Sequence, residues 1–222
     1  MASMITLTSA DGFKFPAYVA KPAGKPRGAL VVVQEIFGVN SHIRAVADGY
    51  AADGYLAVAP ALFERASPGY ETGYSAEEIA ASRELMSKVS MDDALKDVAA
   101  SIEYAKSGGK VGIVGYCWGG TVAWLSATRL AGLACAVPYY GGQMGKFIDE
   151  TPRCPVTGHF GEQDTMPAPD QIRALVAAHP SVTAHFYEAG HGFNCDQRGS
   201  YNAQASALAR SRTLAFLAEQ IG

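Results

Sequence analysis

The hydrophobic residues of the chain fall into short apolar runs separated by stretches with helical periodicity. The run Ala29–Val33 is apolar throughout, which predicts a strand covered on both faces, as in a parallel sheet flanked by helices. Further apolar runs occupy residues 55–59, 111–114 and 134–137, and the segments 155–160 and 182–188 continue the series of predicted strands. This alternation of strands and helices predicts an α/β protein with a mostly parallel, doubly wound sheet.

Three further patterns predict a hairpin at the N-terminus, the start of an internal helix, and a helix at the C-terminus. Residues 4–20 alternate around Asp11-Gly12, and a DG pair between two β-prone runs predicts an antiparallel hairpin, because both turn positions tolerate φ > 0. Ser75 and Glu78 form a capping-box pattern at the start of a helix, and residues 203–221 close the chain with an amphipathic helix. We therefore expect a parallel α/β core with an antiparallel N-terminal hairpin.

The chain has no long Ser-, Gly- or Pro-rich linker and no internal repeat, so residues 1–222 are expected to form a single domain. The stretch 60–74 is the longest without clear periodicity. Its Pro, Gly and aromatic content suits a loop folded over the mouth of a pocket.

Composition narrows the class of protein. Of the 222 residues 49% are hydrophobic, and 18 Lys and Arg against 21 Asp and Glu give a net charge of −3 without any block of like charge. This balance argues against a nucleic-acid partner, which needs clustered basic residues. No apolar run is long enough to cross a bilayer, and four cysteines without a CxxC pair suggest reduced thiols, so we expect a cytoplasmic protein, with a monomer favoured.

The strongest chemical signal is a strand that runs into a tight turn and then a helix, Val111-Gly-Ile-Val-Gly-Tyr-Cys-Trp-Gly-Gly120 followed by residues 121–129. Glycines at Gly115 and Gly119 permit strand and helix to approach closely, while the central residue is held in a strained conformation. Cys117 would stand exposed at the carboxyl edge of the sheet, where the helix N-terminus favours its thiolate. The backbone N–H of Trp118 would point to a developing oxyanion, so the turn suits acyl transfer.

A base and an orienting acid follow in the order typical of such hydrolases. Asp164 comes just after the predicted strand 155–160, and His191 comes after the strand 182–188, flanked by glycines. Both would therefore lie on loops at the same edge of the sheet as Cys117. The imidazole would take the thiol proton and return it to the leaving group, while the carboxylate fixes the tautomer.

Each residue also has a plainer interpretation. The GxCxG turn could simply bury a small thiol, Asp164 could cap the following helix, and a single histidine is often a surface residue. His191 and Cys195 have HxxxC spacing but no further ligands at suitable spacing, so we expect no metal and no cofactor. The agreement of order, strand context and spacing favours a triad of Cys117, Asp164 and His191.

The sequence resembles the dienelactone hydrolases (carboxymethylenebutenolidases) of the α/β-hydrolase fold over nearly its whole length. The matching motifs are Gln34-Glu-Ile-Phe-Gly-Val-Asn40, Gly112-Ile-Val-Gly-Tyr-Cys-Trp-Gly-Gly120, Val137-Pro-Tyr-Tyr-Gly141, Phe160-Gly-Glu-Gln-Asp-Thr-Met-Pro167 and Ala189-Gly-His-Gly-Phe193. The resemblance implies the triad named above and hydrolysis of a small enol lactone to a linear oxo-acid, maleylacetate in the best-known case.

The same resemblance assigns further roles. Glu35 would hold or deprotonate the nucleophilic thiol, and Ile36 would supply a second oxyanion N–H. The family also holds the substrate carboxylate with arginines, but one of those positions is Cys195 here, so Arg198 is the nearest candidate. Arg83 is a candidate for the other arginine, at a position that does not align cleanly, and Tyr140 is a candidate pocket residue.

A cysteine nucleophile restricts the substrate class. Thiolate attack on an alkyl ester tends to reverse, because the thiolate leaves more readily than an alkoxide, whereas an enol leaving group is less basic and can tautomerise. Activated esters, lactones or thioesters are therefore favoured. The alternatives are a broad carboxylesterase or thioesterase, a non-catalytic binding protein on the same scaffold, and a thiol redox protein that pairs Cys117 with Cys195.

Overall fold

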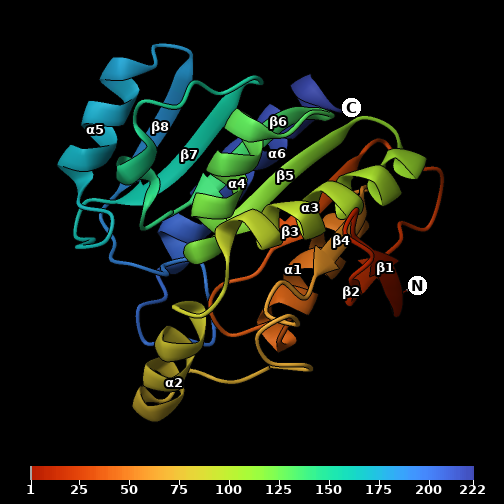
Figure 1. Cartoon of the computed structure of the whole chain (residues 1–222). Coiled ribbons are helices and arrows are strands. Elements are labelled where there is room, and N and C mark those ends of the chain that lie inside the picture. The colour runs from red at the N-terminus through yellow and green to blue at the C-terminus, as the bar shows by residue number, and fades with distance from the viewer. Residues whose placement is uncertain (1) are drawn as a thin grey trace. The chain divides into compact units, whose positions relative to one another are not determined.

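The computed structural model describes residues 2–222, and the chain divides into two compact units, one up to Val111 and the other from Gly112 to Gly222. Each unit is an α/β layer structure in its own right (Figure 1). None of the helices within residues 2–222 combines the length and the apolarity that crossing a bilayer requires.

The first unit contains four strands in the order β1-β2-β4-β3. The hairpin strands β1 (Ala2–Thr8) and β2 (Lys14–Ala20) pair antiparallel, with Leu7 opposite Phe15, and β2 continues antiparallel onto β4 (Leu56–Pro60). β3 (Ala29–Val33) then pairs parallel with β4. All residues of β3 and β4 are buried, as the continuous apolar runs predict.

Three α-helices belong to this unit. α1 (Ser41–Ala52) and α3 (Met91–Ala105) both pack on β3 and β4, and α3 continues into a short 3₁₀ turn, η1 (Lys106–Gly108). α2 (Ala76–Met86) buries only Ser82 and projects from the unit (Figure 1). Its N-terminus carries the predicted capping box, in which the Ser75 side chain accepts from the Glu78 N–H and the Glu78 carboxylate accepts from the Ser75 N–H.

The second unit contains four strands in the order β5-β6-β7-β8. These are β5 (Val111–Tyr116), β6 (Leu133–Tyr139), β7 (Val156–Gly161) and β8 (Val182–Tyr187). β7 pairs parallel with both β6 and β8. The helices are α4 (Trp118–Arg129), α5 (Pro169–Ala178) and α6 (Ala203–Gln220), with a 3₁₀ turn η2 (Met144–Phe147); α4 and α6 lie on opposite sides of β6 (Figure 1).

The predicted fold class is confirmed: the strands are mostly parallel, helices flank them, and the N-terminal hairpin is antiparallel. Several element boundaries differ from the prediction by one or two residues, and one helix boundary differs by more. The helix expected at residues 121–129 begins three residues earlier, at Trp118, directly after Cys117. Glycine lowers intrinsic helix propensity, but here Gly119 and Gly120 lie inside the helix because β5 and β6 approach it closely. The organisation as a single domain stays a prediction.

Candidate active site

The turn between β5 and α4 holds Cys117 in a strained conformation. Its φ is 56° and its ψ is −117°, and such a φ is uncommon for a residue with a side chain. The Cys117 N–H donates to the Tyr139 carbonyl at the end of β6, over 3.1 Å, and its own carbonyl accepts from the Gly120 N–H. A Cβ on Gly115 would collide with the Gly119 carbonyl, so glycine at this position is required for the helix to start immediately after the nucleophile candidate.

The three predicted triad side chains lie together in the second unit. His191 Nε2 is 3.1 Å from Cys117 Sγ, and His191 Nδ1 is 2.9 Å from Asp164 Oδ2. Asp164 follows β7 and is buried, while Cys117 and His191 are partly exposed. The arrangement is a hydrogen-bonded chain from a buried carboxylate through an imidazole to an accessible thiol, which is the geometry of an activated nucleophile.

The charge environment favours the imidazolium form of His191. Desolvation on its own would lower the pKa of His191, but the Cys117 thiolate and the Asp164 carboxylate outweigh it and raise this pKa to about 10. A protonated His191 beside Cys117 is the partner that a thiolate requires.

Two backbone features fix the acid and the base. Gly161, the last residue of β7, lies so close to the Ala189 carbonyl that a Cβ there would collide with it, which brings the Asp164 loop against the His191 loop. The Met166 N–H donates to Asp164 Oδ1 over 2.8 Å, leaving Oδ2 for His191. This role of Met166 was not predicted, although an aspartate that accepts from the N–H two residues later is a common turn pattern.

Three other predicted residues of the second unit surround the triad. Trp118 is the first residue of α4, where the helix itself does not use the backbone N–H groups. Tyr140 is fully buried with φ 38°, and its ring meets the His191 ring edge-on at 5.2 Å. The Arg198 guanidinium packs directly against Gly192. A Cβ placed on this glycine would lie only 2.5 Å from Arg198 Nη1.

The remaining predicted residues belong to the first unit. Glu35 and Ile36 follow β3 and are 1% and 6% exposed. The Tyr74 hydroxyl donates to Glu35 Oε2 over 3.5 Å and accepts from Asn40 Nδ2 over 3.1 Å, which ties the end of the loop 60–74 to Glu35. Arg83 is exposed on α2.

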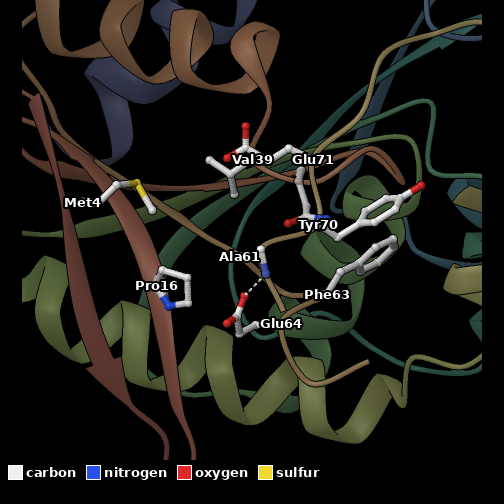
Figure 2. Close-up of a pocket in the computed structure, with 10 residues that line it drawn as sticks. Met4, Pro16, Val39, Ala61, Phe63, Glu64, Tyr70 and Glu71 are labelled. Carbon is white, nitrogen blue, oxygen red and sulfur yellow. Dashed lines mark hydrogen bonds between the residues drawn. The ribbon is translucent and has the colours of Figure 1, made fainter. Parts of the chain in front are cut away.

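The loop 60–74 lines a pocket of about 120 Å³ in the first unit. Figure 2 shows Met4 and Pro16 on one side of this pocket and Phe63 and Tyr70 on the other. Gln34 also lines it and fastens the loop, since its Oε1 accepts from the Leu62 N–H while its Nε2 donates to the Glu35 carbonyl. The predicted loop thus shapes a cavity beside the Gln34-Glu35 segment.

The other cysteines differ from Cys117 in their surroundings. Burial raises the pKa of Cys135 to about 12 and the pKa of Cys154 to about 11. Cys195 is fully buried. At neutral pH the thiols of Cys135 and Cys154 therefore stay protonated and poorly nucleophilic.

Comparison with known proteins identifies the family. Residues 15–221 match the model of the dienelactone hydrolase family. The chain is 38% identical to carboxymethylenebutenolidase of Pseudomonas putida, with 96% of this chain and 95% of the relative covered. It is 30% identical to carboxymethylenebutenolidase 1 of Cupriavidus pinatubonensis, again with 96% of this chain and 95% of the relative covered.

Solved structures agree with this result. A Klebsiella pneumoniae protein provisionally named a dienelactone hydrolase superposes with a TM-score of 0.88 at 31% identity, covering 99% of this chain and 98% of that one. A dienelactone hydrolase-like promiscuous phosphotriesterase from metagenomic libraries shares the fold, with a TM-score of 0.81 at 19% identity over 100% of this chain and 99% of that one. The chain therefore belongs to the dienelactone hydrolase family, hydrolases of ester and lactone bonds built on the α/β-hydrolase fold.

Proposed function

We propose that the protein is a cysteine-dependent hydrolase that opens a small enol lactone, of which dienelactone yielding maleylacetate is the best-known case. The observation that carries this proposal is the chain from Cys117 Sγ to His191 Nε2 at 3.1 Å and from His191 Nδ1 to Asp164 Oδ2 at 2.9 Å. Family membership supports the same class of substrate.

The reaction follows from this geometry in two steps. The Cys117 thiolate attacks the lactone carbonyl carbon, a C–S bond forms, and the ring C–O bond breaks as the enol oxygen takes the proton from His191 Nε2. Water then attacks the resulting thioester, gives one proton to His191 Nε2, and displaces the Cys117 thiolate. Asp164 keeps the imidazole in the tautomer that faces the sulfur throughout.

The oxyanion of each tetrahedral intermediate is assigned to the Trp118 N–H, which begins α4, and to the Ile36 N–H. Glu35 takes the family role of accepting the thiol proton before His191 does. Tyr140 and Arg198, which lie against His191 and Gly192, are proposed to contact the substrate, and Arg83 is a further candidate for its carboxylate.

A second candidate function is hydrolysis of a broader set of activated esters or thioesters. The residue at position 195 favours it. The family has an arginine there, after the base histidine, whereas this chain has the fully buried Cys195. A pocket with fewer carboxylate-binding groups would accept uncharged acyl groups.

The test is the loss of ultraviolet absorbance of cis- and trans-dienelactone with wild-type protein, Cys117→Ala and the matched control Cys154→Ala. We expect rapid loss with the wild type and the control, and a rate at least roughly a thousandfold lower in Cys117→Ala. Turnover that survives in Cys117→Ala would refute the nucleophile. Inactivity toward both lactones together with Cys117-dependent cleavage of p-nitrophenyl acetate would favour the broader esterase.

Glu35 is tested separately through the thiol. Glu35→Gln should slow alkylation of Cys117 by iodoacetamide, because the group that accepts the thiol proton is lost. An alkylation rate equal to that of the wild type would argue against this role.

A further inference from the structure

A buried chain of hydrogen bonds lies behind the candidate active site, and the proposed reaction does not use it. At its centre is the fully buried His159 of β7. His159 Nδ1 is 2.8 Å from the Tyr187 hydroxyl, and His159 Nε2 is 2.9 Å from Thr213 Oγ1. Thr213 Oγ1 is in turn 2.6 Å from the hydroxyl of Tyr139, and Arg212 Nη1 donates to the Tyr187 oxygen over 3.2 Å.

The Arg212 contact agrees with one direction of donation along this chain. A guanidinium can only donate, so the Tyr187 oxygen accepts from Arg212 and its O–H is available to His159 Nδ1. Desolvation, with the charges of His185 and Arg212, lowers the pKa of His159 well below its ordinary value, so the ring is neutral. In the tautomer that carries the ring proton on Nε2, Nδ1 accepts from the Tyr187 O–H, Nε2–H donates to Thr213, and the Thr213 O–H donates to Tyr139.

Tyr139 connects this chain to the nucleophile. Its carbonyl accepts the N–H of Cys117 over 3.1 Å, and its ring packs 4.8 Å from that of Tyr116, the residue before the nucleophile. Because Cys117 is held at φ 56°, its orientation depends on such external contacts. A shift of the Tyr139 main chain would move the Cys117 sulfur.

The backbone of His159 reaches the base. The Tyr140 N–H donates to the His159 carbonyl over 2.8 Å and thereby fixes a residue whose φ is 38°. The Tyr140 ring then meets the His191 ring edge-on at 5.2 Å. Hydrogen bonds and ring contacts thus connect His159 to Cys117 through Tyr139 and to His191 through Tyr140.

We propose that His159, with Thr213 and the Tyr139 hydroxyl, is a positioning residue. It holds the Cys117 turn and His191 in the relative position that acyl transfer requires. This inference rests on the proposed function for its catalytic consequence, but not for its effect on the Cys117 thiol. Catalysis tolerates little displacement, since misplacing a reacting group by about 1 Å can cost roughly a hundredfold in rate.

The test removes one hydroxyl on each side of the same imidazole. Thr213→Val removes the hydroxyl that bonds to His159 Nε2 and to the Tyr139 hydroxyl, and it keeps the shape of the side chain. Thr213→Ser keeps a hydroxyl at this position. Tyr187→Phe deletes the bond on the opposite side of the ring, away from Tyr139. For each variant we would measure kcat, KM, the rate of Cys117 alkylation by iodoacetamide, and the thermal midpoint.

We expect Thr213→Val to lower kcat about tenfold and to change the alkylation rate severalfold, with KM nearly unchanged. Thr213→Ser should restore both rates. Tyr187→Phe should lower the thermal midpoint while leaving both rates near those of the wild type. Should Thr213→Val fail to fold, Tyr139→Phe deletes the other end of the same hydrogen bond.

Two outcomes would overturn the inference. Unchanged alkylation in Thr213→Val would show that the chain does not position the thiol. Equal loss of rate in Thr213→Val and Tyr187→Phe, in proportion to their loss of stability, would show a merely structural role. Failure of the proposed function is recognised separately, as turnover that persists in Cys117→Ala.

Discussion

The pKa of His191 offers the sharpest test of the charge arrangement at the site. Its ordinary value is 6.5 and its value in the structure is about 10, although desolvation acts in the opposite direction. At 1.36 kcal/mol per pH unit, the net stabilisation of the imidazolium is about 5 kcal/mol. Cys117→Ser removes the thiolate, which is the largest contribution that raises this pKa, so the pKa of His191 should fall by about one to three pH units.

Histidine ring protons observed by NMR between pH 6 and pH 11 provide the measurement. His191→Gln assigns the resonance among the five histidines, and His159, which stays neutral in this range, is an internal control that should not titrate. A His191 midpoint in Cys117→Ser within about half a pH unit of the wild-type value would refute the assignment of the shift to the Cys117 charge. A wild-type midpoint near 6.5 would refute the ion pair itself.

Three more predictions concern stability and local order. Gly115→Ala should cost about 3 kcal/mol of unfolding free energy, measured by urea denaturation, because the new Cβ meets the Gly119 carbonyl. A loss below about 1 kcal/mol would contradict the close packing. Ser75→Ala should raise the rate of amide hydrogen exchange in α2 about fivefold, because loss of the N-cap costs about 1 kcal/mol of helix stability. Ser75→Asp keeps a capping side chain and should leave the exchange rate near that of the wild type. Equal exchange rates in the two variants would argue against the cap. The folded-state pKa of His191 is raised, so its stabilisation is full below pH 6.5 and is lost as the pH rises toward 10. The difference in unfolding free energy between wild type and His191→Gln should therefore shrink over that interval, and a difference that grows would contradict the sign.

Much of the fold could be predicted because several short sequence patterns each indicate one kind of element. The wholly apolar run Ala29–Val33 is a strand buried on both faces, and Asp11-Gly12 lies in the turn of an antiparallel hairpin. The positions of Asp164 and His191 after parallel strands also made their proximity to Cys117 predictable, since such strands end at one edge of a sheet. Their catalytic roles stay predictions.

The supports of the site could not be predicted in this way. His159 stands alone within a strand, and its partner Thr213 comes from a helix far along the chain, so no spacing connects them. The start of α4 at Trp118 was also missed, because helix propensity penalises glycine while close packing against β6 requires it.

The four cysteines differ in burial and in thiol reactivity, and this difference has a practical use. Cys135 and Cys154 keep their protons at neutral pH and Cys195 has no exposed surface, so a mild alkylating reagent should label the molecule at a single atom, Cys117 Sγ. A stoichiometric probe at that sulfur would count competent molecules in a preparation without knowledge of the natural substrate. Because an acylated Cys117 has no free thiol, a thiol-reactive tag would capture only the free form, and the acylated chain would stay untagged. The mass of the Cys117 peptide in the untagged fraction would then report the acyl group of the substrate.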